Sequence, residues 1–256
     1  MSFETLGQEY KLARTIPIKN IDKVSTDIYQ NIYLSTEQGV IHKYNSDGER
    51  LLTYSPPKVA TVSLLEAWNS IKIFVLYRDL QQYIVLDRFL SVLENADIED
   101  VDIGFARVMT LSAQNTFWFF DDSDFSLKKY DQSAHKVISK TPFDLMLPRD
   151  KYDINYIREY ENGLYLNDKN SGILVFDNFG NYRKKLPFNG LSQFGFLKDE
   201  LYFIDSDTIR FFNVYNLSQR AKYIPNPEKA DKIIANEQGC YLFSQNNMFV
   251  LKKNSP

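Results

Sequence analysis

The chain has 256 residues, 44% of them hydrophobic, which is enough to bury a full core as one domain or as two small ones. Its formal net charge of −3, with both signs mixed along the chain, argues against a dedicated nucleic-acid or polyanion binder. No apolar run approaches the roughly 20 residues of a transmembrane helix, and 19 Phe and 17 Tyr favour strands over helices.

The N-terminus begins Met1-Ser2-Phe3-Glu4 and has neither a basic region nor an apolar core, so no signal peptide is expected. Two interpretations follow: a cytosolic protein, or a mature periplasmic or cell-envelope chain with an added Met. We favour the second, and the compartment stays open. The single cysteine, Cys240, excludes an internal disulfide and does not distinguish the compartments.

Short apolar strands with a central aromatic residue recur along the chain. The markers are Tyr33, Phe74, Phe117, Tyr165, Tyr202 and Tyr241, separated by 41, 43, 48, 37 and 39 residues. A second apolar strand follows each of the first five markers and ends at Asn45, Asp87, Asp131, Asp177 or Asn213, residue types that suit a tight turn. Four strand-like segments per unit of roughly 40 residues is the period of a β-propeller blade.

A polar third strand follows these two apolar strands, and it often exits through a proline. Leu186-Pro187 and Ile224-Pro225 are the clearest cases, and charges such as Arg183 and Lys222 protect an outer edge from pairing. The sixth unit ends near Pro256 without this strand, whereas residues 9–18 form one before the first unit begins. The N-terminal strand is therefore predicted to complete the last blade and close a ring of six.

The innermost strands are expected about a dozen residues before each marker. They are predicted at Ile21–Ser25, Lys58–Leu64, Phe105–Thr110, Asp153–Arg158, Leu191–Phe196 and Ala230–Ala235, lining the central channel. Acids on these strands are few, chiefly Asp22, Asp153 and Asp231. A recognisable pair of carboxylates for acid and base catalysis is missing from them, which counts against a glycosidase.

Two connections are long, and both join an outer strand to the next inner strand, so both should lie on one rim. Glu94–Asp102 is acidic and includes Asp97, Glu99 and Asp100, while Thr141–Asp153 is apolar. The candidate partner-binding residues on this rim are Phe143, Leu145, Met146, Leu147, Arg149, Asp97, Glu99 and Asp100. The alternative for the apolar loop is packing over the adjacent blade. The cations in or near the inner strands and the rim are candidates to pair with the acidic loop instead of a ligand: Lys58, Arg107, Arg149, Lys151 and Arg158.

The segment from Asn31 to Gly48, NIYLSTEQGVIHKYNSDG, resembles a repeat of the NHL-type six-bladed propellers, and Gly163–Gly180 resembles a second copy with the same hairpin length. The other four units match in spacing and aromatic placement. The resemblance implies a binding scaffold in most members, a lyase or hydrolase in some, and a subunit of an extracytoplasmic complex in others.

No motif for metal or nucleophile chemistry is recognised. The two histidines, His42 and His135, fall in different units and offer too few ligands for zinc or iron, and Cys240 is interpreted as a buried apolar residue. Asp121-Asp122-Ser123-Asp124 is the densest carboxylate cluster. It is interpreted as a solvated turn, with a Ca²⁺ site as the alternative.

These patterns predict an all-β, six-bladed β-propeller over residues 1–256. The predicted function is a non-enzymatic scaffold without a cofactor or metal, which binds a protein or peptide partner through one rim and binds no nucleic acid. One alternative is a subunit of a bacterial envelope secretion or assembly complex, and so of a membrane-associated assembly. The other is an enzyme or carbohydrate-binding propeller that uses the channel mouth.

Overall fold

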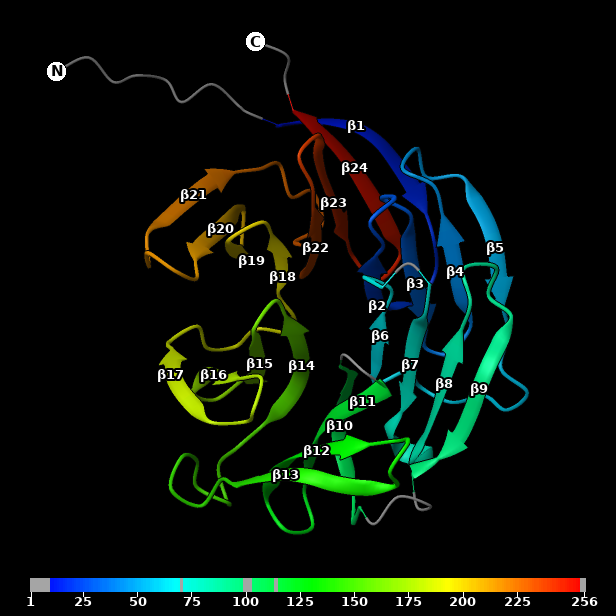
Figure 1. Cartoon of the computed structure of the whole chain (residues 1–256). Helices are drawn as coiled ribbons and strands as arrows, with labels where there is room; N and C mark the ends of the chain where they lie inside the picture. Colours follow the sequence, from blue (N-terminus) through cyan, green and yellow to red (C-terminus); the bar gives the residue numbers. More distant parts are fainter. Residues whose placement is uncertain (1–9, 70, 99–102, 113–114, 254–256) are drawn as a thin grey trace, which may run out of the picture.

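The computed structural model describes residues 10–69, 71–98, 103–112 and 115–253, and these residues form six four-stranded antiparallel sheets around one axis (Figure 1). The chain is therefore a six-bladed β-propeller, as the spacing of the marker aromatics predicts. Glu99 and Asp100, two of the candidate partner-binding residues, lie outside the described residues. No described helix is long and apolar enough to span a bilayer.

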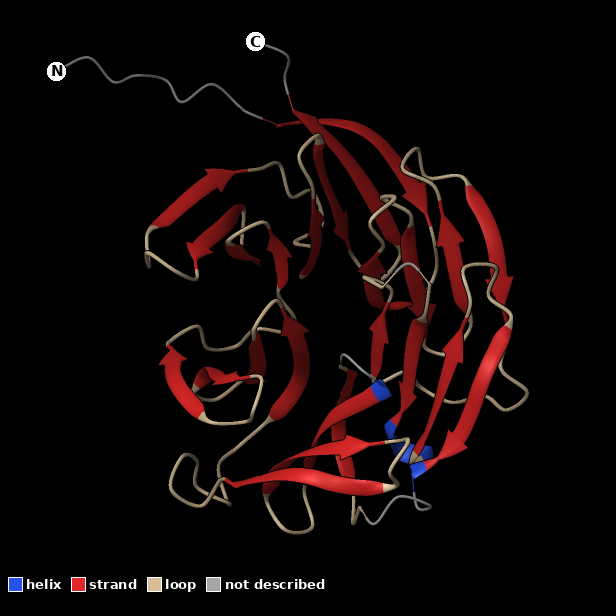
Figure 2. Ribbon diagram, viewed as in Figure 1, coloured by secondary structure: helices blue, strands red, loops and turns tan. Residues whose placement is uncertain are grey.

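Each blade runs from an inner strand at the axis to an outer strand at the perimeter (Figure 2). Blade 1 contains β2 (Ile21–Thr26), β3 (Ile32–Thr36), β4 (Ile41–Tyr44) and β5 (Arg50–Tyr54). Blade 2 contains β6 (Leu64–Glu66), β7 (Ile73–Tyr77), β8 (Gln82–Leu86) and β9 (Val92–Asp97), with the short 3-10 helix η1 (Arg78–Leu80) between β7 and β8. Blade 3 contains β10 (Ala106–Leu111), β11 (Thr116–Asp121), β12 (Ser126–Asp131) and β13 (Lys136–Pro142).

The other three blades repeat this order. Blade 4 contains β14 (Ile154–Tyr160), β15 (Gly163–Asp168), β16 (Gly172–Asp177) and β17 (Tyr182–Leu186). Blade 5 contains β18 (Gly195–Leu197), β19 (Glu200–Asp205), β20 (Thr208–Asn213) and β21 (Gln219–Tyr223). Blade 6 contains β22 (Lys232–Ala235), β23 (Gly239–Phe243), β24 (Asn247–Lys253) and, as its outer strand, β1 (Tyr10–Pro17).

The N-terminal strand closes the ring, as predicted. β1 pairs antiparallel with β24 from Tyr10 opposite Lys253 to Pro17 opposite Asn247. Tyr10 is buried, and the closure covers the edge that β24 would otherwise present to solvent. The two ends of the described chain therefore meet in one blade.

The core lies between the blades, where apolar residues from both faces of the middle strands interlock. β7 and β11 are buried along their whole lengths because each is covered by a neighbouring blade on both sides. Burial of such strands is the main stabilising term in this architecture.

Two inner strands differ from their predicted positions. In blade 2 the strand begins at Leu64 instead of Lys58, because the segment after Pro56 and Pro57 does not join the sheet before residue 63. In blade 5 it is limited to Gly195–Leu197. Gly195 is required there, since a Cβ atom would lie 2.3 Å from the Tyr202 ring.

Candidate functional site

The connections between strands divide the propeller into two faces. We call the face with the outer-to-inner connections and the β-turns between second and third strands the mouth face. The opposite face is the turn face. The residues on either side of both predicted loops lie on the mouth face, because one loop joins β9 to β10 and the other joins β13 to β14.

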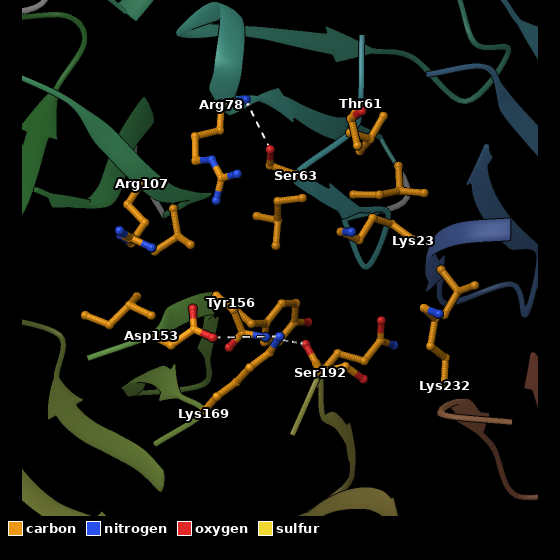
Figure 3. A pocket seen from close by; sticks show the side chains of 18 of the residues that line it. Lys23, Thr61, Ser63, Arg78, Arg107, Asp153, Tyr156, Lys169, Ser192 and Lys232 are labelled. Carbon is orange, nitrogen blue, oxygen red and sulfur yellow. Dashed lines mark hydrogen bonds and ion pairs between the residues drawn. The ribbon is translucent and has the colours of Figure 1, made fainter. Parts of the chain in front are cut away.

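A cavity of about 260 Å³ opens at the centre of the mouth face, and residues from all six blades line it (Figure 3). Its floor is apolar and buried, with Val24, Leu64, Val108 and Ile154 at the beginning of the inner strands. Its wall is charged. The cations in the lining are Lys23, Arg78, Arg107, Lys169 and Lys232, and the acids are Asp79 and Asp153.

Every cation of this wall has an aspartate beside it. Three partners are sequence neighbours or nearly so: Asp22 lies 2.6 Å from Lys23 Nζ, Asp79 lies 3.2 Å from Arg78 Nε and Asp231 lies 3.0 Å from Lys232 Nζ. The other two pairs connect different strands of a blade. Arg107 Nε donates to Asp122 at 2.7 Å, and Lys169 Nζ lies 3.9 Å from Asp153 (Figure 3).

Arg107 is the most firmly held of these cations. Its guanidinium lies over the Tyr152 ring, 5.0 Å from the centroid, and the Tyr152 hydroxyl donates to the same Asp122 carboxylate at 3.0 Å. Burial opposes the charge, but the hydrogen bond and charge attraction to Asp122, together with Tyr152, outweigh it and raise the pKa of Arg107. Arg107 is therefore a fixed positive group at the mouth.

The three acids that the sequence places on or beside the inner strands, Asp22, Asp153 and Asp231, all belong to these ion pairs. Sequence reasoning missed Lys23, Arg78, Lys169 and Lys232. One signal was present: Asp22-Lys23 and Asp231-Lys232 are the same dipeptide at the beginning of the inner strand in two adjacent blades. Lys169 and Arg78 lie in turns whose position above the channel follows only from ring closure.

Two apolar side chains of the loop, Phe143 and Leu147, are buried, which corrects the expectation that they are exposed contact residues and fits the alternative of packing over the adjacent blade. Phe143 and Leu147 are buried between blades 3 and 4, and the Phe143 ring stacks on Phe176 with centroids 5.5 Å apart. A turn in which the Leu147 amide donates to the Phe143 carbonyl places both side chains on one side. Met146 packs partly against the same cluster.

Leu145 and Arg149 lie on the outside of this turn. Leu145 is 101% exposed, and Arg149 donates to Asp144 at 2.8 Å while lying over the Phe125 ring. Asp97 is exposed and belongs to the outer strand β9, where it accepts from Gln82 at 3.0 Å, so the strand extends further than expected. Arg107 and Arg149 pair with Asp122 and Asp144. Residues 99–102 of the acidic loop lie outside the described residues, so the pairing of cations with that loop stays a prediction.

The carboxylates of the Asp121–Asp124 cluster are bound by cations of the protein. Asp121, which is buried, accepts from Lys128 at 2.7 Å, and Asp124 lies 2.7 Å from Lys140 and 2.9 Å from Lys128. Within the described ranges, no group of three or more His, Cys, Asp or Glu side chains is placed to hold a metal ion. The cluster is thus an ion-paired turn in this structure.

The turn face carries a different set of exposed residues. Many turns there begin with Asp or Asn whose side-chain oxygen accepts from the amide two residues later, which is an Asx turn. In four of them the residue at that position is aromatic and well exposed: Tyr29, Phe89, Phe179 and Tyr215. The repeated pattern of Asn or Asp, any residue, then Phe or Tyr could have identified them from sequence.

Comparisons with known proteins place the fold but not the activity. No protein-family model matches the chain, and no curated protein matches it. The Pan2 WD40 domain of Neurospora crassa is similar, with 7% identity, a TM-score of 0.65 and coverage of 97% of both chains. Catalytically inactive virginiamycin B lyase from Staphylococcus aureus is similar with 12% identity and a TM-score of 0.62, and the match covers 96% of this chain and 100% of the other. BamB from Moraxella catarrhalis is similar with 10% identity and a TM-score of 0.54, and the match covers 96% of this chain and 98% of the other. These similarities show a β-propeller.

Proposed function

We propose that this propeller is a non-enzymatic scaffold that binds a protein or peptide partner on its mouth face. The observation that carries the proposal is the convergence of charged side chains from five of the six blades on one central cavity. The fully exposed Leu145 lies on the same face and offers an apolar contact outside the cavity. Charged groups steer a partner into place and fix its register, and an exposed apolar side chain adds contact area.

Three observations favour binding over catalysis. The cations of the mouth are held by aspartates instead of being poised beside a nucleophile, and neither histidine contributes to the cavity lining. Cys240 is buried in β23, and burial raises the pKa of its thiol to about 12, so it remains protonated near neutral pH. Stoichiometric Zn²⁺, Fe or Ca²⁺ in the purified protein would instead support an enzyme, one of the two alternatives.

Site-specific photo-crosslinking in the source organism tests the proposal. A photoreactive residue at Leu145 probes the mouth face, and one at Phe179 probes the turn face; both positions are well exposed and belong to neighbouring parts of the ring. We expect a discrete protein adduct from Leu145 and none from Phe179. Adducts from Phe179 alone would assign recognition to the exposed aromatics of the turn face and contradict the proposal.

The cell-envelope alternative has support only from the fold that this chain shares with BamB. We retain the envelope as the proposed location. Fractionation of the natively expressed protein, with determination of its mature N-terminus, distinguishes a processed envelope protein from a cytosolic one. An unprocessed chain in the cytosolic fraction would reject this location and leave the mouth-face proposal intact.

A further inference from the structure

The lining of the mouth cavity has a charge opposite to that of the chain. Five cations and two acids give the lining a net charge of +3, whereas the whole chain carries −3. The overall charge argues against a general polyanion binder, but the electrostatic potential inside a recessed cavity is set mainly by the charges that line it. Charges at the wall of a cleft with an apolar floor act at low effective dielectric and focus the potential into the opening.

Three of the aspartate partners lie outside the cavity lining: Asp22, Asp122 and Asp231 each pair with a lining cation, but none of the three lines the cavity. Lys232 is the most recessed of their cations: its side chain is 16% exposed, whereas that of Asp231 is 62% exposed. Water screens an exposed carboxylate more than a recessed ammonium, so Lys232 contributes a positive field towards the channel axis. In the other two pairs the carboxylate is the less exposed partner, and the positive character there rests on which side chain lines the cavity.

The positive groups surround the opening. In Figure 3, Arg78 and Lys23 approach from one side and Lys169 from the opposite side. Lys23 Nζ and Lys232 Nζ each use one recorded hydrogen bond, to Asp22 and Asp231, out of the three donors of an ammonium group. An anion at the mouth can therefore accept from several cations without displacing the aspartates that hold them.

We propose that the mouth cavity binds carboxylate groups of an acidic peptide segment. This inference rests on the proposed function and adds the chemistry of the partner. The volume of about 260 Å³ accommodates one or two acidic side chains and excludes a folded domain, so the segment enters as a loop or a chain end. The apolar floor contacts the methylene groups of the entering side chains, and the ring of cations receives their carboxylates.

Titration of the full chain with acetylated, amidated hexaglutamate tests the inference, with hexaglutamine and hexalysine as comparison peptides and inorganic phosphate and acetate as competitors. We expect saturable binding of hexaglutamate alone, weakened by salt. The double substitution Lys23→Gln with Lys232→Gln should reduce the affinity about tenfold or more, because two charge-assisted contacts are lost. Lys23→Arg with Lys232→Arg should retain binding.

The matched control is Lys11→Gln with Lys185→Gln, which changes the net charge equally on exposed outer strands. The inference would be overturned if the control lost as much affinity for hexaglutamate as the double substitution in the cavity, or if the protein bound hexaglutamine as tightly as hexaglutamate. It would also be overturned if phosphate displaced hexaglutamate at concentrations where acetate does not, because the site would then select phosphate over carboxylate. Melting temperatures show whether each variant is folded. If hexaglutamate does not bind but the partner still crosslinks at Leu145, only the carboxylate-binding site is rejected. Loss of the crosslink with hexaglutamate binding retained rejects the proposed partner instead.

Discussion

The hydroxyl of Thr110 donates a hydrogen bond of 2.6 Å to Oε2 of Glu66, which joins the inner strands of blades 3 and 2. Glu66 is 2% exposed. Burial raises the pKa of this carboxyl group to about 7, although the hydrogen bond from Thr110 acts in the opposite direction. A titratable group thus lies inside the ring with a pKa near neutrality.

The first prediction concerns the pH dependence of stability. The pKa of Glu66 is higher in the folded chain than its ordinary value of 4.5, so the folded state retains the proton longer, and stability falls as pH rises from about 4.5 to about 7. Glu66→Gln keeps an acceptor for Thr110 and removes the titration. We expect it to be more stable than the parent at pH 8, by up to about 3 kcal/mol, and to differ little at pH 4.

Urea unfolding at pH 4, 6 and 8 measures this difference. Glu37→Gln, on an exposed turn of the mouth face, is the control and should leave the pH profile unchanged. A constant stability difference between the Glu66→Gln variant and the parent at all three pH values would contradict the assignment of the titration to Glu66.

The second prediction separates the two parts of the apolar loop. Phe143→Ala should lower the free energy of unfolding by about 3–5 kcal/mol, because the ring fills the space between blades 3 and 4. Leu145→Ala should change it by less than about 0.5 kcal/mol, since the side chain is fully exposed. Chemical denaturation measures both. A large loss in the Leu145 variant would show that this residue has a structural role.

The loop also shows where inference from sequence stops. The spacing of the marker aromatics predicts six blades because each blade needs one buried middle strand per repeat, a local and periodic requirement. Whether Phe143 turns inward depends on the space between two blades, which no local pattern records. The composition of the mouth cavity likewise depends on contacts between blades that no local pattern shows. Lys169 and Arg78 are ordinary turn residues until ring closure brings them over a common axis.

The third prediction concerns the buried ion pair of Asp121 and Lys128. The carboxylate accepts from the amides of Gly104, Phe105 and Ser123 as well as from Lys128. Although burial acts the other way, these bonds keep the pKa of Asp121 below its ordinary value. Lys128→Met leaves the buried carboxylate without its cation and should cost about 3–5 kcal/mol at pH 7.

The cost should diminish as pH falls through the range in which Asp121 becomes protonated, because a neutral carboxyl group no longer needs a cation. Lys140→Met is the matched control. Lys140 pairs with Asp124 and is 50% exposed, so its removal should cost less than about 1 kcal/mol. Equal effects of the two substitutions on urea unfolding at pH 7 would show that the buried position of Lys128 is unimportant.

The last prediction concerns closure of the ring. Deletion of residues 1–17 removes β1, uncovers the edge of β24 and takes away the buried Tyr10 side chain. We expect a melting temperature lower by about 5 °C or more, and association that increases with concentration, because an unpaired edge strand pairs with another chain. Calorimetry and size-exclusion chromatography measure the two effects. Deletion of residues 1–8, which retains all of β1, is the control and should reproduce the parent. If the chain that starts at Ile18 were monomeric and had the same melting temperature as the parent, blade 6 would be stable with three strands. Pairing of β1 with β24 would then contribute little to the stability of the ring.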